Sequence, residues 1–213
     1  MPRCHCESTD SMFDDRVVRR ELRRYRKRGP AAFTAALLAL IEEAAPPPES
    51  TLLDVGGGVG AIHHRLLDHG FSSATHLDAS HAYLEAAKDE TARVGHEGRV
   101  VFRDGDFAEA LAERPQFDVV TLDRVVCCDP DFDVMLNGAA SRARRMVAFT
   151  YPRPRRVIKW AIAGLNLFQK LSRSAFRAYV HDPLAMADVL ERNGLRRRSA
   201  GGTWVWAAEV FER

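Results

Sequence analysis

The segment Leu52–Gly60, LLDVGGGVG, constrains the fold more than any other part of this sequence. The apolar residues Thr51–Val55 predict a strand, and glycines at 56, 58 and 60 follow it directly. Glycine allows a tight turn and a close approach of the backbone to a ligand. We therefore expect a parallel sheet that binds a cofactor at the carboxyl ends of its strands, with this loop in the site.

The chain after this loop alternates short apolar strands with helices. Strands are predicted at Thr51–Val55, Ala74–Asp78, Val100–Phe102, Phe117–Leu122 and Arg145–Thr150, with helices between them, one of them short and near residues 108–113. Such alternation is typical of an α/β fold with helices on both faces of a parallel sheet. The last two strands, Gly194–Ser199 and Thr203–Phe211, are joined by a Gly-Gly turn that leaves no room for a crossover helix, so they must pair antiparallel.

Two helices are predicted before the glycine loop. Met12–Arg28 reads as a basic helix that Gly29-Pro30 ends, and Ala31–Ala45 as a second helix closed by Pro46–Pro48. We expect an N-terminal tail and helical cap over residues 1–48 and the main domain over residues 49–213.

The composition fits a soluble globular protein, with 46% hydrophobic and 28% charged residues in 213. No secretory signal is visible, and the longest apolar run, Ala31–Ile41, is shorter than the roughly 20 residues that span a bilayer. Four cysteines in a chain of this length do not resemble a disulfide framework. We expect a cytoplasmic protein with reduced thiols.

Two cofactors compete for the glycine loop. Gly56, Gly58 and Ala61 satisfy the dinucleotide pattern G-x-G-x-x-G/A, but Asp54 at the strand end would be a poor neighbour for a pyrophosphate. S-adenosylmethionine (SAM) has no phosphate and carries a sulfonium and an ammonium group, so it tolerates Asp54. The residues Asp54–Gly60 resemble the D/E-x-G-x-G-x-G motif of class I SAM-dependent methyltransferases.

This resemblance extends from Thr51 to the C-terminus. It implies a Rossmann-like, seven-stranded, mostly parallel sheet with an antiparallel C-terminal strand, and SAM as cofactor. It also implies that Asp78, 20 residues after Gly58, binds the ribose hydroxyls, and that Asp106 and Phe107 lie at the adenine. The predicted cofactor-binding residues are Asp54, Gly56, Gly57, Gly58, Gly60, Asp78, Ala79, Asp106, Phe107 and Asp123.

The residues that bind the methyl acceptor, the molecule that receives the methyl group, are predicted to follow the fourth and fifth strands. Asp123 and Arg124 follow one strand, and Tyr151 follows the other. Further along, Phe176–Pro183, FRAYVHDP, resembles the R-A-Y-x-H segment of magnesium-protoporphyrin methyltransferases, which esterify a porphyrin propionate. The resemblance implies an oxygen acceptor on a small, partly apolar and acidic molecule. The predicted catalytic residues are Asp123, Arg124, Tyr151, Arg177 and His181, with His181 as base and Arg124, Arg153 or Arg177 holding a carboxylate.

Two basic segments allow other interpretations. The stretch Arg156–Arg173 is an apolar helix with basic ends, expected to pack on the core; otherwise it covers a greasy substrate or rests on a membrane surface. The basic run Arg16–Arg28 could bind RNA, which would indicate an RNA-directed methyltransferase, but a solvated face or lid is favoured and nucleic acid is not expected as a partner. The oligomeric state is left open.

A metal-binding protein on the same fold is the remaining alternative. Cys4, Cys6, Cys127 and Cys128, with His5, could gather a thiophilic ion. The spacings C-x-C and C-C are not the usual C-x-x-C, so no metal is expected. Cys127 and Cys128 are predicted to pack beneath the site, and the adjacent histidines 63 and 64 to be surface or interface residues.

Overall fold

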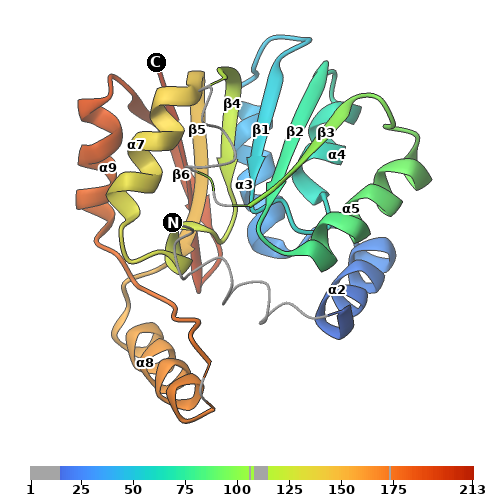
Figure 1. Ribbon diagram of the computed structural model, residues 1–213. Coiled ribbons are helices and arrows are strands. Elements are labelled where there is room, and N and C mark those ends of the chain that lie inside the picture. The colour runs from blue at the N-terminus through green and yellow to red at the C-terminus, as the bar shows by residue number, and fades with distance from the viewer. Residues whose placement is uncertain (1–14, 106, 108–114, 173) are drawn as a thin grey trace.

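The computed structural model describes residues 15–105, 107, 115–172 and 174–213 (Figure 1). The short helix predicted near residues 108–113 therefore lies outside the described residues. The helices are α2 (Asp15–Arg28), α3 (Ala32–Glu43), α4 (Ala61–Asp68), α5 (His81–Val94), α7 (Phe132–Arg142), α8 (Arg156–Leu171) and α9 (Pro183–Arg192), with a 3-10 turn η1 (Val126–Cys128). The strands are β1 (Thr51–Val55), β2 (Ser73–Asp78), β3 (Val100–Asp104), β4 (Phe117–Leu122), β5 (Ala143–Pro152), β6 (Arg196–Gly202) and β7 (Trp206–Glu212).

The strands form one seven-stranded sheet in the order β3-β2-β1-β4-β5-β7-β6. The pairs among β1 to β5 are parallel, whereas β7 pairs antiparallel with both β5 and β6. The predicted α/β fold with an antiparallel C-terminal strand is confirmed. Strand order reverses between β1 and β4, and ligands of open parallel sheets bind at the carboxyl ends of the strands at such a switch point.

Each face of the sheet carries its own hydrophobic layer. Successive residues of β1 point to opposite faces, so Leu52 joins the layer under α3 and α4, and Leu53 joins the layer under α7 and α9. Both residues are fully buried. The helix α3 supplies Leu37 and Ile41 to this core, and it packs against β5, β6 and β7. Residues before the triple proline thus contribute directly to the layer that covers the sheet.

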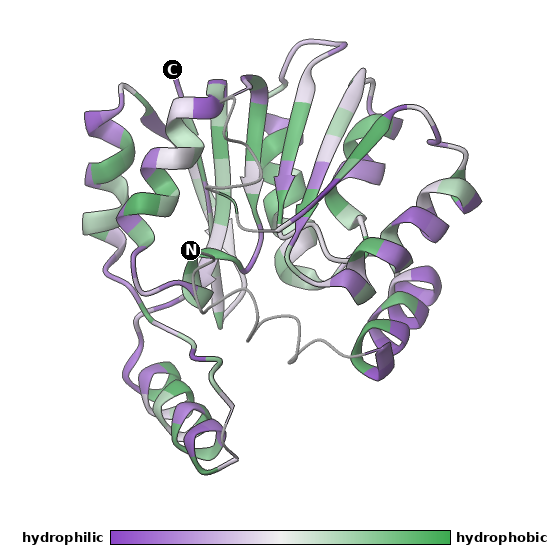
Figure 2. Ribbon diagram, in the orientation of Figure 1, coloured by the Kyte–Doolittle hydropathy of each residue, from purple (hydrophilic) through white to green (hydrophobic). Residues whose placement is uncertain are grey.

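The helices α2 and α8 flank the carboxyl edge of the sheet and pack very differently (Figure 1). On α2, Val18 is buried beside Tyr83 of α5. On α8 only Ile158 and Gln169 are buried, and the exposed apolar residues include Trp160 at 78% and Leu171 at 76%. Figure 2 shows α8 projecting from the body, with green apolar positions along its length. The interpretation of this segment as a helix packed on the core was therefore wrong.

No helix among the described residues is long and apolar enough to cross a membrane.

Candidate functional site

The glycine loop is anchored to the end of the neighbouring strand. The N–H of Gly56 donates to the carbonyl of Leu77 over 2.7 Å. Gly58 has a φ of 55°, in the left-handed region that favours glycine, and its N–H donates to Asp78 Oδ2 over 2.9 Å. The loop after β1 and the acid that ends β2 are thereby held together at the carboxyl edge.

Asp78 is a buried carboxylate held by the main chain. Its Oδ1 accepts the N–H of Ser80 over 2.9 Å, and only 7% of the residue is exposed. Burial raises the pKa of Asp78 to about 6, although hydrogen bonds from the backbone of Ser80 and Gly58 oppose that rise. Each oxygen has a second lone pair, so the group can still accept hydrogen bonds from a ligand. Ala79 lies between these two residues and is half-buried.

The acid that ends β1 lies deeper. Asp54 is 1% exposed, and its Oδ1 accepts the hydroxyl of Thr121 over 2.8 Å. Its Oδ2 lies 3.4 Å from Nδ1 of His63 on α4. Burial raises the pKa of Asp54 above its ordinary value. Asp54 also lines the cavity described below, so it faces both the interior and the ligand side.

Asp123 and Arg124 form the wall after β4. The Asp123 carboxylate accepts the hydroxyls of Thr34 and Thr150, each over 2.6 Å, and burial raises its pKa. Arg124 has a φ of 62°, unusual for a residue with a side chain, and its N–H donates to Thr150 Oγ1 over 2.8 Å. Strained backbone of this kind gathers at functional sites because the surrounding contacts maintain it.

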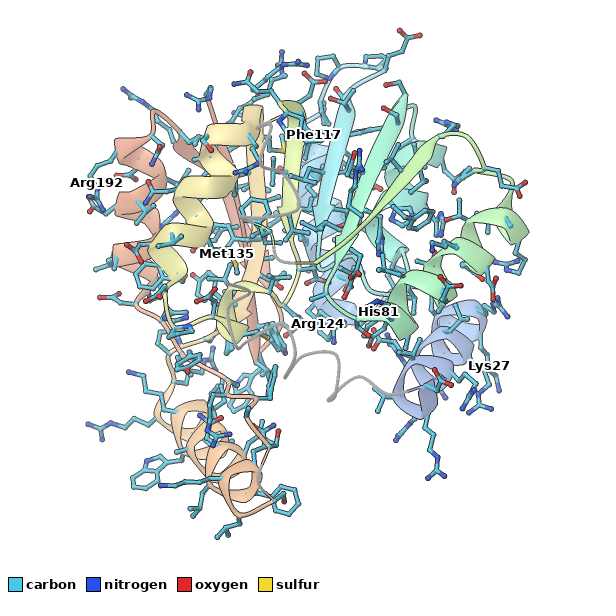
Figure 3. All side chains as sticks on the ribbon, viewed as in Figure 1. Lys27, His81, Phe117, Arg124, Met135 and Arg192 are labelled. Carbon is cyan, nitrogen blue, oxygen red and sulfur yellow. The ribbon has the colours of Figure 1, made fainter. Side chains whose placement is uncertain are left out.

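Glu21 of α2 lies over the glycine loop. Glu21 accepts the Tyr83 hydroxyl over 2.6 Å and the Arg124 guanidinium over 3.0 Å. That guanidinium also lies 4.7 Å from the ring centroid of Phe33. Figure 3 labels Arg124 at the edge where the strands end.

The glycine loop, α2 and the wall after β4 line a cavity of about 410 Å³, counted with its solvent-open part. Its lining residues are Glu21, Arg24, Tyr25, Pro30, Ala31, Thr34, Asp54, Gly56, Gly57, Gly58, Val59, Ala61, Ile62, Asp123 and Arg124.

Three residues that were predicted to bind the methyl acceptor instead make hydrogen bonds within the protein. Tyr151 is 4% exposed, and its hydroxyl donates to Glu209 Oε1 over 2.6 Å. Arg177 donates to the carbonyls of Ser174 and Phe176 in its own loop. Arg153 donates to carbonyls of the β6–β7 hairpin. Neither Tyr151 nor Arg177 lines the cavity.

His181 fastens the segment after β4 to the segment after α8. Its Nε2 lies 2.9 Å from the carbonyl of Asp129 and 3.1 Å from that of Val126. Carbonyls only accept, so Nε2 carries the proton in the neutral ring and Nδ1 keeps its lone pair. Tyr179 adds an N–H bond to the carbonyl of Cys127 over 2.7 Å. The R-A-Y-x-H segment and the vicinal cysteines, far apart in sequence, thus form one unit.

The remaining predicted residues divide as follows. Cys127 is buried and Cys128 half-buried, and their sulfurs lie 3.8 Å apart. Phe107 is half-buried against α7, with the Arg142 guanidinium 4.8 Å from its ring centroid. Asp106, Cys4, His5 and Cys6 lie outside the described residues.

The placement predicted for two histidines was wrong. His63 is 0% exposed and His64 is 3% exposed, because α4 turns these residues toward the sheet. Burial lowers the pKa of each to about 3. Glu21, Thr34 and Tyr83 also belong to the site, although the sequence did not predict them. Their roles become visible only where α2, α3 and α5 meet the glycine loop. A single glutamate in a basic helix, for example, has no sequence pattern that would mark it as a site residue.

The model of a family described as a methyltransferase domain matches residues 47–184, more than half of the chain. The chain therefore belongs to this methyltransferase family. The match includes the glycine loop, Asp78 and the wall after β4. The prediction of a SAM-dependent methyltransferase is confirmed at the level of the family, and the chain is an enzyme of this class.

Solved structures share the fold along nearly the whole chain. Magnesium protoporphyrin IX methyltransferase from Synechocystis PCC 6803, with bound S-adenosylhomocysteine (SAH), has a TM-score of 0.74 at 19% identity, covering 96% of this chain and 98% of that one. A TehB-like SAM-dependent methyltransferase from Corynebacterium glutamicum has a TM-score of 0.63 at 16% identity, covering 92% and 96%. An O-methyltransferase family 2 protein from Planctomyces limnophilus, in complex with apigenin, has a TM-score of 0.66 at 16% identity, covering 92% and 61%. A search of curated proteins gave no match.

Proposed function

We propose that this enzyme transfers the methyl group of SAM to an oxygen, most favourably of a carboxyl group, on a small and partly apolar molecule. The observation that carries the proposal is the hydrogen bond to Asp78 from Gly58, which lines the open cavity. It holds the glycine loop and a buried carboxylate at the switch point of the sheet. That arrangement suits a ligand with ribose hydroxyls and no phosphate.

The cofactor would lie across the loop. Asp78 would accept the ribose hydroxyls, and the predicted region of Asp106 and Phe107 would meet the adenine. Asp54, Asp123 and Glu21 bring carboxylates to the cavity, which favours the ammonium and sulfonium charges of SAM. Methyl transfer is an in-line displacement, so the protein mainly positions the two reactants in a pocket with little water.

An oxygen acceptor needs a partner that takes its proton. A carboxyl group in an apolar pocket has a raised pKa and can arrive protonated. His181 is our proposed base, because its Nε2 faces two carbonyls and Nδ1 keeps the lone pair. Arg124, which lines the cavity, is proposed to orient the methyl acceptor, and Asp123 to support the wall. Roles for Arg177 and Tyr151 stay predictions, because neither residue lines the cavity.

The apolar character of the acceptor is inferred from α8. Leu167 and Phe168 are 59% and 67% exposed, and Lys159 and Lys170 lie on the same helix. An exposed apolar surface rimmed by basic residues suits a membrane interface, where a greasy acceptor also partitions. The Synechocystis neighbour is a magnesium protoporphyrin IX methyltransferase, and a large apolar acid of that kind is compatible with this surface.

Other parts of the proposal remain predictions. These are the division into a cap over residues 1–48 and a methyltransferase domain over residues 49–213, and the cytoplasmic location.

RNA is the alternative acceptor, since α2 carries several arginines and Arg24 lines the cavity.

Calorimetry with SAM and SAH tests the cofactor half. Binding is expected for the wild type, and loss of binding for Gly58→Arg, because Gly58 lines the cavity and its φ of 55° is strained for a residue with a side chain. Absence of binding to the wild type, or equal binding to the variant, would refute the proposal.

A metabolite extract incubated with enzyme and SAM tests the acceptor half. We expect mass spectrometry to detect the addition of one CH₂ to an acidic, apolar compound. Methylation of added RNA, with no change in small acids, would favour the alternative.

A further inference from the structure

A cluster of buried imidazoles lies directly beneath the glycine loop. His63 and His64 on α4 and His76 on β2 are at most 3% exposed, and His96 after α5 is 6% exposed. Binding of SAM through the loop and Asp78 requires none of these rings. Histidine is not among the residue types most often fully buried, so four of them together need a separate explanation.

The fold brings three possible metal ligands to one point. Asp54 and His76 are partners in the parallel β1–β2 ladder and therefore lie on the same face of the sheet. The first turn of α4 places His63 over both of them. One ligand atom from each of these three residues lies within 4.8 Å of the other two.

Two of the three spacings between these ligand atoms match a tetrahedral ion, and the third is within 4.8 Å. His63 Nδ1 lies 3.4 Å from Asp54 Oδ2 and 3.3 Å from His76 Nδ1. Zinc with ligands at about 2.0–2.1 Å in tetrahedral geometry requires neighbouring ligand atoms about 3.4 Å apart.

Without an ion, hydrogen bonding leaves the cluster incompletely satisfied. His63 Nδ1 has at most one proton, so it cannot donate to both Asp54 Oδ2 and His76 Nδ1. Among the described residues, Asp54 Oδ2 and the Nε2 atoms of His63, His64 and His76 have no hydrogen-bond partner. An unsatisfied buried polar group destabilises the folded state. A cation at Nδ1 of both rings would satisfy Asp54 Oδ2 and both Nδ1 lone pairs, whereas the Nε2 protons would still have no partner among the described residues.

The surroundings support ligation in two further ways. Thr121 Oγ1 donates to the second oxygen of Asp54 over 2.8 Å, the outer contact that orients a metal-binding carboxylate. A Cβ at Gly57 would lie 2.4 Å from His76 Nδ1 and 3.0 Å from Asp54 Oδ2, so only glycine lets the loop close over the cluster. Asp54 also lines the cavity, so the cluster lies directly beside it.

We propose that Asp54, His63 and His76 form a binding site for a first-row divalent metal ion, with Zn²⁺ the best match. Two imidazoles and one carboxylate suit Zn²⁺ and disfavour Mg²⁺ and Ca²⁺, which prefer all-oxygen ligands. The ion would join β1, β2 and α4 below the loop and hold the loop in place. This site differs from the thiol site considered from the sequence, because it contains no cysteine.

The test uses the full-length protein, treated with EDTA, dialysed and titrated with Zn²⁺ by calorimetry. We expect one equivalent to bind and to raise Tm in the wild type. His63→Gln and His76→Gln should each weaken binding by more than about a hundredfold, since even outer contacts of metal sites contribute about ten- to a hundredfold. His69→Gln, an exposed histidine just after α4, is the matched control and should bind as the wild type does.

Two further measurements keep the proposal falsifiable if a ligand variant fails to fold. Thr121→Val keeps the shape of the side chain, and should weaken Zn²⁺ binding by about tenfold or more. Co²⁺ bound to the wild type should give visible d–d bands without a thiolate charge-transfer band.

Absence of Zn²⁺ binding, binding unchanged in the folded His63 and His76 variants, or a thiolate band would each overturn the proposal. SAM binding is measured separately, so failure of this site and failure of the proposed function are distinguishable.

Discussion

The cofactor side of the site is held by the main chain, whereas the acceptor side is held by side chains from distant segments. On the cofactor side, Asp78 accepts backbone N–H groups from Gly58 and Ser80. On the acceptor side, His181 contacts carbonyls more than 50 residues away, and Tyr151 contacts Glu209. A short motif encodes local backbone geometry, so the glycine motif predicts the residues of the cofactor side well. Contacts between distant segments are encoded by the whole fold.

The largest expected effect is on the cofactor side. Asp78→Ala should weaken SAM binding about a hundredfold, because two hydrogen bonds to a charged acceptor are worth about 3 kcal/mol or more. The variant also removes the anchor of Gly58. Calorimetry with SAM and SAH measures the change.

The matched control is Asp104→Ala, which removes a half-exposed acid at the end of the next strand, paired with His81. It should leave the affinity unchanged. An equal loss in this control would mean that Asp78 has no special role.

The second effect is on the acceptor side. His181→Gln should lower kcat about a hundredfold, the usual contribution of a general base, with the Kd for SAM unchanged. A glutamine amide can still donate to the carbonyls of Val126 and Asp129, so the fold should be retained. The assay follows methylation of the identified acceptor by mass spectrometry across pH. An unchanged kcat with a lowered Tm would assign His181 only to holding the two segments together.

The third effect concerns α8. The double variant Phe168→Ser with Leu171→Ser should reduce partition to anionic phospholipid vesicles at least tenfold, because burying each apolar side chain is worth about 1.5–3 kcal/mol. Cosedimentation measures the bound fraction. Val134→Ser, at an exposed position of α7, is the control and should have no effect. If the wild type, the double variant and Val134→Ser partition equally, α8 does not bind membranes.

The smallest effect concerns the attachment of α2. Glu90 accepts bonds from Arg93 and Arg26; burial raises its pKa, but these bonds prevail and hold the pKa below the ordinary 4.5. A lowered folded-state pKa means stability that is present above pH 4.5 and is lost as the pH falls through the folded value. Because both arginines are about half exposed, the loss should be only about 0.2–1 kcal/mol.

Hydrogen exchange measures this effect as the protection of α2 amides relative to those of α9. In the wild-type protein this ratio should decrease once the pH is lowered past 4.5. In Glu90→Gln the ratio should be low at every pH. A ratio independent of pH in both proteins would show that α2 is held by its apolar contacts alone.

The sequence by itself determined the parallel sheet, its antiparallel last strand and the glycine loop with Asp78. These follow from the alternation of apolar strands and helices, and from glycines whose backbone angles few other residues adopt. Periodicity also predicted a helix in Arg156–Arg173, where the structure has α8. It could not predict that α8 lies exposed, because an apolar face looks the same whether or not another element covers it.

Only the tertiary structure decided which side chains meet. It placed Glu21 of a basic helix over the loop and turned His63 inward to meet Asp54 and His76. The three metal-site residues come from a strand, a helix and a second strand, and they share no spacing that a motif could capture. The sequence specifies each residue's local conformation, whereas the packing of α4 on the β1–β2 pair brings their polar atoms within reach of one ion.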